Sequence, residues 1–324
     1  MTLAIRFHRP GGPEVLCPET IDPGRPGPGE ALVRHAAVGL NFIDIYHRTG
    51  FYPLPLPSGI GLEGAGVVEA VGEGAAGIRV GDRVAYAGGP VGAYSEARCL
   101  PADRLLRLPA AIDFRTGAAM MLQGLTAAYL LRKTCRVQAG DAVLIHAAAG
   151  GVGMIACQWA KALGATVIGT ASTEAKAELA RAHGADHVIL YGREEVAARV
   201  RALTGGEGVA VVYDGVGKDT FEASLDSLRT RGTMVSFGNA SGPLPPIDPL
   251  QLTQKGSLFF TRPTLAHYTA KREELVELGE ALFEMVLSGK VRIEVNQSYP
   301  LVDAARAHAD LAARRTTGST VLLP

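Results

Sequence analysis

The sequence has few cysteines, no net charge and no long apolar run, and each absence excludes a class of protein. Its four cysteines are scattered without a C-x-x-C spacing, so we expect neither a disulfide framework nor a cysteine metal site. Lys and Arg together number 32, as do Asp and Glu, which argues against a nucleic-acid partner. No apolar run approaches the roughly 18 residues of a membrane helix, so we expect no membrane partner.

Two further absences bear on the location of the protein and on metal binding. No apolar stretch follows Arg6, His8 and Arg9, so we expect no signal peptide. A cytoplasmic location agrees with this and with the low cysteine content. The eight histidines show no spacing of metal ligands, and His146, which ends an apolar run, is expected in the core.

Glycine, by contrast, is abundant at 40 of 324 residues, and the chain is long enough for two domains. Over residues 1–110, short strand candidates are separated by Pro-Gly clusters, which is typical of a partly closed β-barrel. From residue 142, six strand candidates alternate with helical segments, which predicts an α/β fold with a doubly wound parallel sheet. We expect a helix near 271–288 and a strand at 320–323 to return to the first domain, giving a first domain 1–123, a second domain 124–262 and a segment 263–324 that returns to the first.

A junction between a buried strand and a helix suggests a ligand. Residues 143–153 read Val-Leu-Ile-His-Ala-Ala-Ala-Gly-Gly-Val-Gly, an imperfect G-x-G-x-x-G in which Ala148 replaces the first glycine. Such a turn points free backbone N–H groups and a helix dipole at one spot, which suits a pyrophosphate. The predicted contacts are Ala149, Gly150, Gly151, Val152 and Gly153. The alternative is a tight turn without a ligand.

The end of the second strand of this predicted sheet lacks an acidic residue. Sites that prefer NAD place Asp or Glu there to hold the ribose 2′-OH, whereas this chain has Ser172 and Thr173, with Lys176 one turn later. Hydroxyl groups, a helix N-terminus and a cation suit a 2′-phosphate, so we predict NADPH as the cofactor. The alternative is that Ser172 only caps the helix and Lys176 is a solvated charge, while Glu174 could weaken a phosphate site.

Several motifs together resemble the medium-chain dehydrogenase/reductase superfamily. They are Asn41-Phe42-Ile43-Asp44-Ile45-Tyr46, Leu56–Val68, Gly81-Asp82-Arg83-Val84, Gln123-Gly124-Leu125-Thr126-Ala127 and the glycine turn. Within it, the chain is similar over nearly its whole length to the quinone oxidoreductase branch, which includes zeta-crystallin. The resemblance implies a GroES-like catalytic barrel followed by an NADPH-binding Rossmann domain.

The departures from the zinc alcohol dehydrogenases of this superfamily predict a metal-free site. Their zinc-binding His in a Gly-His-Glu triplet is replaced by Leu62, and no cysteine occurs near Asn41. An open zinc site cannot be assembled from these residues. Without a Lewis acid, alkoxide formation from an alcohol is unfavourable. Hydride transfer to an electron-poor quinone or conjugated carbonyl is the easier reaction.

A polar cluster near the predicted first helix is the candidate catalytic site. Asn41 and Asp44 are neighbours at i and i+3, so we expect them to face one way. Tyr46 and Tyr52 match the two cleft tyrosines of the branch, and Asn41 matches a residue near the nicotinamide. Hydroxyl and amide groups could stabilise an acceptor oxygen as it becomes anionic. The alternative is that Asn41 and Asp44 cap the backbone while the tyrosines pack.

The resemblance also implies further cofactor contacts, mostly at the carboxyl ends of strands, where a doubly wound sheet binds its ligand. They are Thr126 near the nicotinamide ribose, Tyr191 near the adenine, Val216, Phe237, Gly238, Arg262 and, near the carboxyl terminus, Arg314.

We therefore predict a zinc-independent NADPH:quinone oxidoreductase, with two alternatives. One is a reductase of α,β-unsaturated ketones or aldehydes that uses the same site. The other, suggested by relatives of zeta-crystallin, is a nucleotide-regulated RNA-binding or structural protein, against which the charge balance argues. The segment Ser257–Thr261 is expected to form an apolar sheet edge and pair across the two-fold axis of a homodimer.

Overall fold

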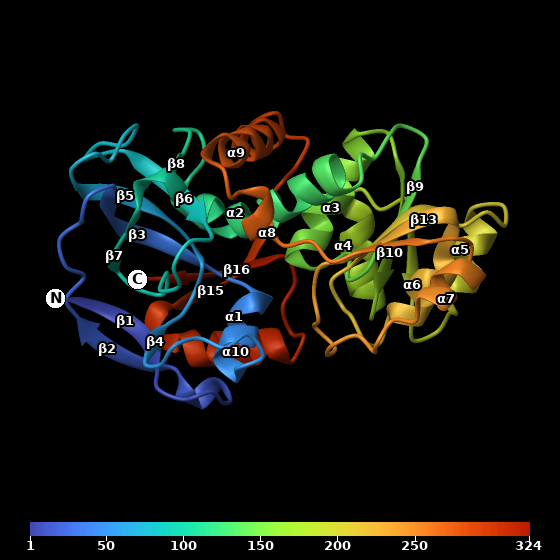
Figure 1. The fold of residues 1–324 in the computed structure, drawn as a ribbon, viewed down its shortest axis with the longest axis horizontal. Helices are drawn as coiled ribbons and strands as arrows, with labels where there is room; N and C mark the ends of the chain where they lie inside the picture. The colour runs from blue at the N-terminus through green and yellow to red at the C-terminus, as the bar shows by residue number, and fades with distance from the viewer. The chain divides into compact units, whose positions relative to one another are not determined.

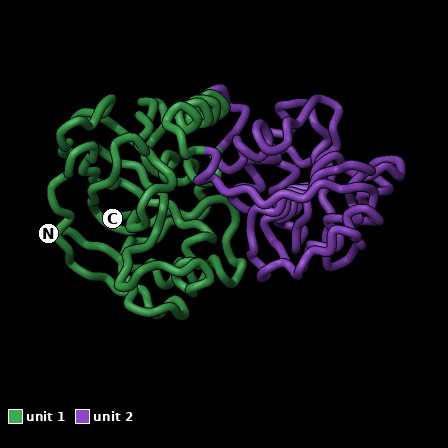
Figure 2. The backbone as a smooth tube through the Cα atoms, viewed as in Figure 1, with its two compact units in different colours: residues 1–125, 269–287, 293–324 green, residues 126–268, 288–292 purple.

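The computed structural model describes all 324 residues, and the chain divides into two compact units (Figures 1 and 2). Unit 1 comprises residues 1–125, 269–287 and 293–324, and unit 2 comprises residues 126–268 and 288–292. The predicted division into one domain of residues 1–123 and 263–324 and a second of residues 124–262 stays a prediction, for which limited proteolysis is the test. None of the helices combines the length and apolar character that a membrane crossing needs.

Unit 2 is built on a six-stranded parallel sheet with the order β11-β10-β9-β12-β13-β14. Its strands are β9 (Ala142–Ile145), β10 (Thr166–Ala171), β11 (His187–Leu190), β12 (Val209–Asp214), β13 (Leu228–Ser236) and β14 (Phe259–Thr261). Its helices are α3 (Gly151–Ala162), α4 (Glu174–Ala182), α5 (Val196–Leu203), α6 (Phe221–Ser227), α7 (Pro249–Gln254) and α8 (Leu265–Tyr268). This confirms the predicted doubly wound sheet.

The strand sequences explain this arrangement. The central strands β9 and β12 read Ala-Val-Leu-Ile and Val-Ala-Val-Val-Tyr-Asp, and helices on both faces bury them, as in parallel sheets generally. The chain runs outward from β9 through β10 to β11, then crosses back to β12 and runs outward the other way. The strand order therefore reverses between β9 and β12, the point at which such sheets bind ligands. The only tryptophan, Trp159, lies on α3 with 2% of its surface exposed.

Unit 1 contains a seven-stranded and a three-stranded β-sheet. Its strands are β1 (Thr2–Phe7), β2 (Cys17–Ile21), β3 (Glu30–Leu40), β4 (Ser58–Gly59), β5 (Glu63–Val71), β6 (Arg83–Ala87), β7 (Ala97–Pro101), β8 (Leu106–Arg107), β15 (Val295–Pro300) and β16 (Ser319–Leu323). Its helices are α1 (Phe42–Thr49), α9 (Arg272–Leu287) and α10 (Ala304–Ala312), and α2 (Phe114–Tyr129) carries the chain into unit 2.

Long β3 organises the larger sheet of unit 1, because it pairs antiparallel with β5, β7 and β16. The predicted late strand is confirmed as β16, and its pairing places the end of the chain beside Leu40, next to the start of α1. Apolar residues of β1, β3, β16 and α10 form one core, including Ile5, Val38 and Leu322. The site residues that follow β3 therefore start from a rigid element.

Candidate functional site

The carboxyl edge of the sheet in unit 2 brings together most of the predicted cofactor residues. Ala149 to Gly153 follow β9, Ser172, Thr173 and Lys176 follow β10, Tyr191 follows β11, Val216 follows β12, Phe237 and Gly238 follow β13, and Arg262 follows β14. Thr126 also belongs to unit 2, on α2. Arg314 lies in unit 1, between α10 and β16, with a left-handed φ of 57°.

The glycine turn after β9 presents free donors. Gly150 precedes α3 with extended dihedrals, and no side chain caps this helix. The first N–H groups of an α-helix have no acceptor within the helix, so those of Gly151, Val152 and Gly153 can bind an anion. A Cβ on Gly153 would lie 2.3 Å from the Ala147 carbonyl oxygen, so only glycine allows this close turn. The turn therefore fits a pyrophosphate.

The two hydroxyl residues after β10 differ in what they do. Thr173, rather than Ser172, caps α4, because its Oγ1 accepts from the Lys176 N–H at 3.3 Å. Ser172 is exposed beside the helix start. The Glu174 carboxylate accepts a hydrogen bond from Arg181 at 2.8 Å, so its charge is offset there. The arrangement keeps a hydroxyl, a helix N-terminus and the Lys176 cation in one region.

The loops after β12 and β13 approach each other through glycine. A Cβ on Gly238 would lie 2.4 Å from the Gly215 carbonyl oxygen, and one on Gly215 would touch the Phe237 ring at 3.0 Å. Arg262 donates from Nη1 to the Ser236 carbonyl at 2.8 Å, so its guanidinium is fixed at the end of β13. These contacts hold the predicted residues Val216 and Phe237 at the same edge as the glycine turn.

In unit 1, the amide of Asn41 is clamped within a buried polar chain. Its Nδ2 donates to Glu63 Oε2 at 2.6 Å, and its Oδ1 accepts from Gln123 Nε2 at 3.1 Å. Glu63 Oε1 accepts from the Leu122 N–H at 2.7 Å, and Ser319 Oγ donates to Gln123 Oε1 at 2.6 Å. Burial raises the pKa of Glu63 to about 8. This chain fixes the orientation of Asn41, which is predicted to serve both the catalytic site and the cofactor site.

Asp44 holds the start of α1. Its Oδ2 accepts from the Asn41 N–H and from the Tyr94 hydroxyl, each at 2.9 Å, and its side chain is fully buried. Burial raises its pKa to about 7. Asn41 is the N-cap of α1 and forms a capping box with Asp44, so the two residues meet at the start of this helix. The capping alternative therefore describes both residues, and the catalytic role of Asp44 stays a prediction.

The two predicted tyrosines belong to an aromatic cluster at the end of α1. The rings of Tyr46 and Tyr52 pack edge to face with centroids 5.2 Å apart, and Tyr46 also contacts Phe42 and Phe51. Phe51 keeps 43% of its surface exposed. The alternative that the tyrosines pack therefore describes Tyr46 and Tyr52, which also lie close to Asn41 in the sequence.

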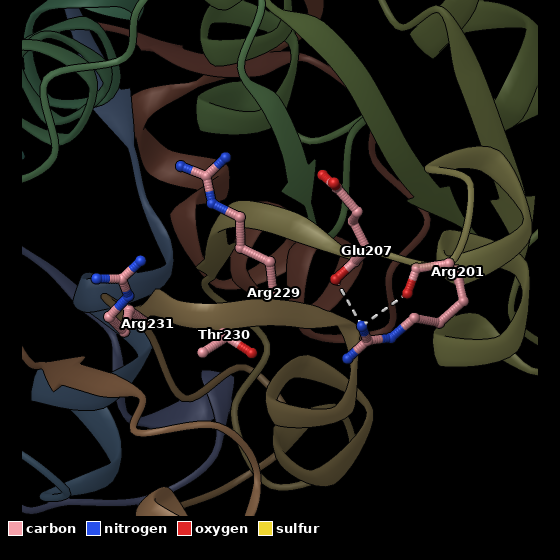
Figure 3. A pocket seen from close by; sticks show the side chains of 6 residues that line it. Arg201, Glu207, Arg229, Thr230 and Arg231 are labelled. Atoms are coloured by element: carbon pink, nitrogen blue, oxygen red, sulfur yellow. Dashed lines mark hydrogen bonds between the residues drawn. The ribbon is translucent and has the colours of Figure 1, made fainter.

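One hollow lies away from these residues. Arg201, Glu207, Arg229, Thr230 and Arg231 line it (Figure 3). It lies at the amino ends of β12 and β13, the edge opposite the glycine turn. The Arg201 guanidinium donates to the carbonyls of Gly206 and Glu207, so it serves to hold this loop. No group of three or more His, Cys, Asp or Glu side chains is placed to share a metal ion.

Sequence reasoning missed three members of the Asn41 clamp, namely Glu63, Gln123 and Ser319. Glu63 and Gln123 lie in motifs that carry the family resemblance, but no role was predicted for them. A signal existed for Glu63, because a carboxylate at the start of a strand that is buried over its first residues requires a buried partner. Ser319 had no local signal, since only the pairing of β16 with β3 brings it near.

Comparisons with known proteins extend these observations. A family model described as alcohol dehydrogenase GroES-like domain matches residues 27–110, and one described as zinc-binding dehydrogenase matches residues 151–279. The chain is 57% identical to a quinone oxidoreductase of Pseudomonas aeruginosa, covering 100% of both. It is 51% identical to Escherichia coli quinone oxidoreductase crystallised with NADPH, with a TM-score of 0.98 over 99% of this chain and 100% of that one. A 2-haloacrylate reductase of Burkholderia is 48% identical over 100% of this chain and 99% of that protein.

Proposed function

The chain belongs to the quinone oxidoreductase family of the medium-chain dehydrogenase/reductase superfamily, and from this premise we propose that it transfers reducing equivalents from NADPH to quinones without zinc. The observation that carries the proposal is the full-length similarity at 51–57% identity, together with a glycine turn whose free N–H groups fit a pyrophosphate. NADPH supplies the hydride. The protein's residues bind and orient it and keep water from the reacting atoms.

We assign roles to the candidate residues as follows. The turn at Ala149–Gly153 binds the pyrophosphate, and Ser172, Thr173 and Lys176 bind the 2′-phosphate. In unit 1, the clamped amide of Asn41 orients the reacting partners, while Tyr46 and Tyr52 offer hydroxyl groups and an aromatic surface to the acceptor. Thr126, Tyr191, Val216, Phe237, Gly238, Arg262 and Arg314 complete the proposed cofactor contacts. Asp44 acts through the helix start, as a positioning residue.

The proposed 2′-phosphate site predicts a selective effect of Lys176→Ala. We expect roughly a ten- to hundredfold loss of NADPH affinity, since a charge-assisted hydrogen bond contributes about 1.5–3 kcal/mol, while NADH affinity stays within twofold. Isothermal titration of both nucleotides measures this selectivity. Lys161→Ala, which removes an exposed lysine that bonds Asp186, is a control that should change neither affinity. Equal losses for both nucleotides in Lys176→Ala would remove Lys176 from the site.

A second acceptor class is supported by the relative named 2-haloacrylate reductase. The same site could reduce an activated carbon–carbon double bond conjugated to a carbonyl or carboxyl group. Turnover of 1,4-benzoquinone, an α,β-unsaturated aldehyde and a 2-haloacrylate at equal NADPH concentration separates the candidates. Turnover of the unsaturated compounds alone would overturn the assignment to quinones. Metal analysis of the active enzyme belongs to the same experiment, because activity that requires stoichiometric zinc would contradict the proposed metal-free reaction.

We also propose a cytoplasmic homodimer that uses the edge of the sheet in unit 2. Strand β14 pairs only with β13, and Phe259 on it is 61% exposed, an apolar edge that proteins rarely leave bare. The strand is shorter than the predicted Ser257–Thr261, because Ser257 adopts a left-handed φ of 55°. Sedimentation at micromolar concentration should give a dimer, and Phe259→Glu should shift it to monomer. A monomeric parent would contradict the proposal.

A further inference from the structure

A buried polar chain in unit 2 crosses the ends of three strands and is used by none of the contacts proposed above. It links Thr170 on β10, His146 after β9, Ser224 on α6 and Asp214 at the end of β12, and at most 2% of each is exposed. His146 Nδ1 lies 3.1 Å from Thr170 Oγ1, and its Nε2 lies 3.0 Å from Ser224 Oγ. Ser224 Oγ donates to Asp214 Oδ2 at 2.9 Å.

Each hydrogen bond in this row of side chains has a definite donor and a definite acceptor. The Asp214 carboxylate accepts four hydrogen bonds, from the N–H groups of Val216 and Gly217 and from the hydroxyls of Thr220 and Ser224. The Ser224 oxygen must then accept from His146 Nε2–H. Desolvation lowers the pKa of His146, and a neutral imidazole has one donor, so Nδ1 accepts from the Thr170 hydroxyl.

At one end, this row of hydrogen-bonded side chains reaches Ala147, the first residue of the glycine turn. Thr170 Oγ1 accepts from the Ala147 N–H at 3.3 Å, and the Thr170 carbonyl accepts from the Ala148 N–H at 3.0 Å. Ala147 has a φ of 51°, a left-handed conformation that costs a non-glycine residue about 1–2 kcal/mol. A strained residue keeps such a shape only where its surroundings determine it, and here those surroundings include the hydrogen bonds of Thr170, together with the Gly150 N–H that donates to the Ala147 carbonyl.

We propose that Thr170, His146, Ser224 and Asp214 are positioning residues for the cofactor: they hold the glycine turn and the loop after β12 in the shapes that bind the dinucleotide. The inference rests on the proposed function, and it concerns residues outside the proposed contacts. Since the pyrophosphate is common to NADPH and NADH, these four side chains must contribute equally to the binding of both nucleotides. This distinguishes it from Lys176, which acts on the 2′-phosphate alone.

The matched variants are Thr170→Val, which keeps the shape and removes the hydroxyl, and Thr170→Ser, which keeps the hydroxyl. In Thr170→Val, titration should give dissociation constants for NADPH and for NADH that are five- to tenfold higher than those of the wild type. In Thr170→Ser, both should stay within twofold of the wild type. The turnover number at saturating NADPH and the KM for quinone should not change. Ile168→Val, a buried apolar change on the same strand, controls for general destabilisation and should bind normally.

Nitrogen-15 NMR of the wild-type protein gives an independent readout. It should show His146 protonated at Nε2 and accepting at Nδ1, and the Nδ1 shift should move in Thr170→Val. Wild-type affinities for both nucleotides in Thr170→Val, or a proton on Nδ1 in the wild type, would overturn the inference. If Thr170→Val does not fold, the wild-type spectrum decides. Failure of the wild type to bind either nucleotide would overturn the proposed function instead.

Discussion

Replacing Gly153 by alanine should abolish NADPH binding at concentrations that saturate the wild type. The new Cβ would lie 2.3 Å from the Ala147 carbonyl oxygen and 2.8 Å from Ala148 Cα, and both are backbone atoms that cannot rotate away. The turn must therefore shift, which costs about 1–3 kcal/mol as overpacking. It also moves the N–H groups of the first helical turn away from the pyrophosphate. Loss of two charge-assisted hydrogen bonds weakens binding by a hundredfold or more.

Two measurements separate the steric effect from the binding effect. Chemical denaturation gives the free energy of unfolding, and nucleotide titration gives the affinity. Gly150→Ala is the graded comparison, because its Cβ would lie 3.2 Å from the same carbonyl oxygen and its φ is negative. We expect a smaller loss of stability there. Normal NADPH affinity in Gly153→Ala would show that the first turn of α3 does not hold the pyrophosphate.

Glu63 should make the protein less stable as the pH rises. Burial raises its pKa to about 8, whereas an exposed glutamate titrates near 4.5. Between these values the native protein binds a proton that the unfolded chain does not, so the free energy of unfolding falls with increasing pH. Each pH unit below 8 contributes about 1.4 kcal/mol, so the loss from pH 6 to 9 is about 2–3 kcal/mol. Asp44, with its pKa raised to about 7 by burial, adds to this slope at lower pH.

Glu63→Gln is the matched control, because it stays neutral at every pH. The buried residues His35 and His308, with pKa values lowered by desolvation to about 4 and about 3, act in the opposite direction below pH 6.5. They are present in both proteins and cancel in the comparison. The stability of the wild type relative to Glu63→Gln should therefore fall from pH 6 to 9, and parallel curves would contradict the prediction. In the variant, the Asn41 amide must turn its oxygen toward the new amide group.

The parallel sheet could be predicted because its strands are apolar runs separated by glycine turns and helices of ordinary length. Strand β15 could not, because its residues alternate between partly buried and exposed and it is held by β16, a partner distant in the chain. Helix α10 has only small residues and one histidine, Ala304, Ala307 and His308, on its buried side, which gives a weak apolar pattern. The local sequence pattern therefore predicts only those elements that are buried through apolar residues of their own.

The candidate site likewise has parts that the local sequence predicts and parts that it does not. The glycine turn was predictable because its geometry depends on consecutive residues. Choosing between Ser172 and Thr173 as the helix cap was not, because adjacent hydroxyl residues satisfy the same rule and only the end of β10 at Ala171 decides. The Asn41 clamp joins four segments of the chain, and no spacing in the sequence indicates that Ser319 supports Gln123.

The lone indole of Trp159, two turns into α3, gives this enzyme a built-in optical probe. Its emission arises from a single buried position on the helix that begins at the glycine turn. A dihydronicotinamide absorbs light where a buried indole emits, so energy transfer would quench that emission on binding. Unfolding of unit 2 and its occupancy by NADPH can then be followed in one unlabelled sample, for the wild type and every variant named above.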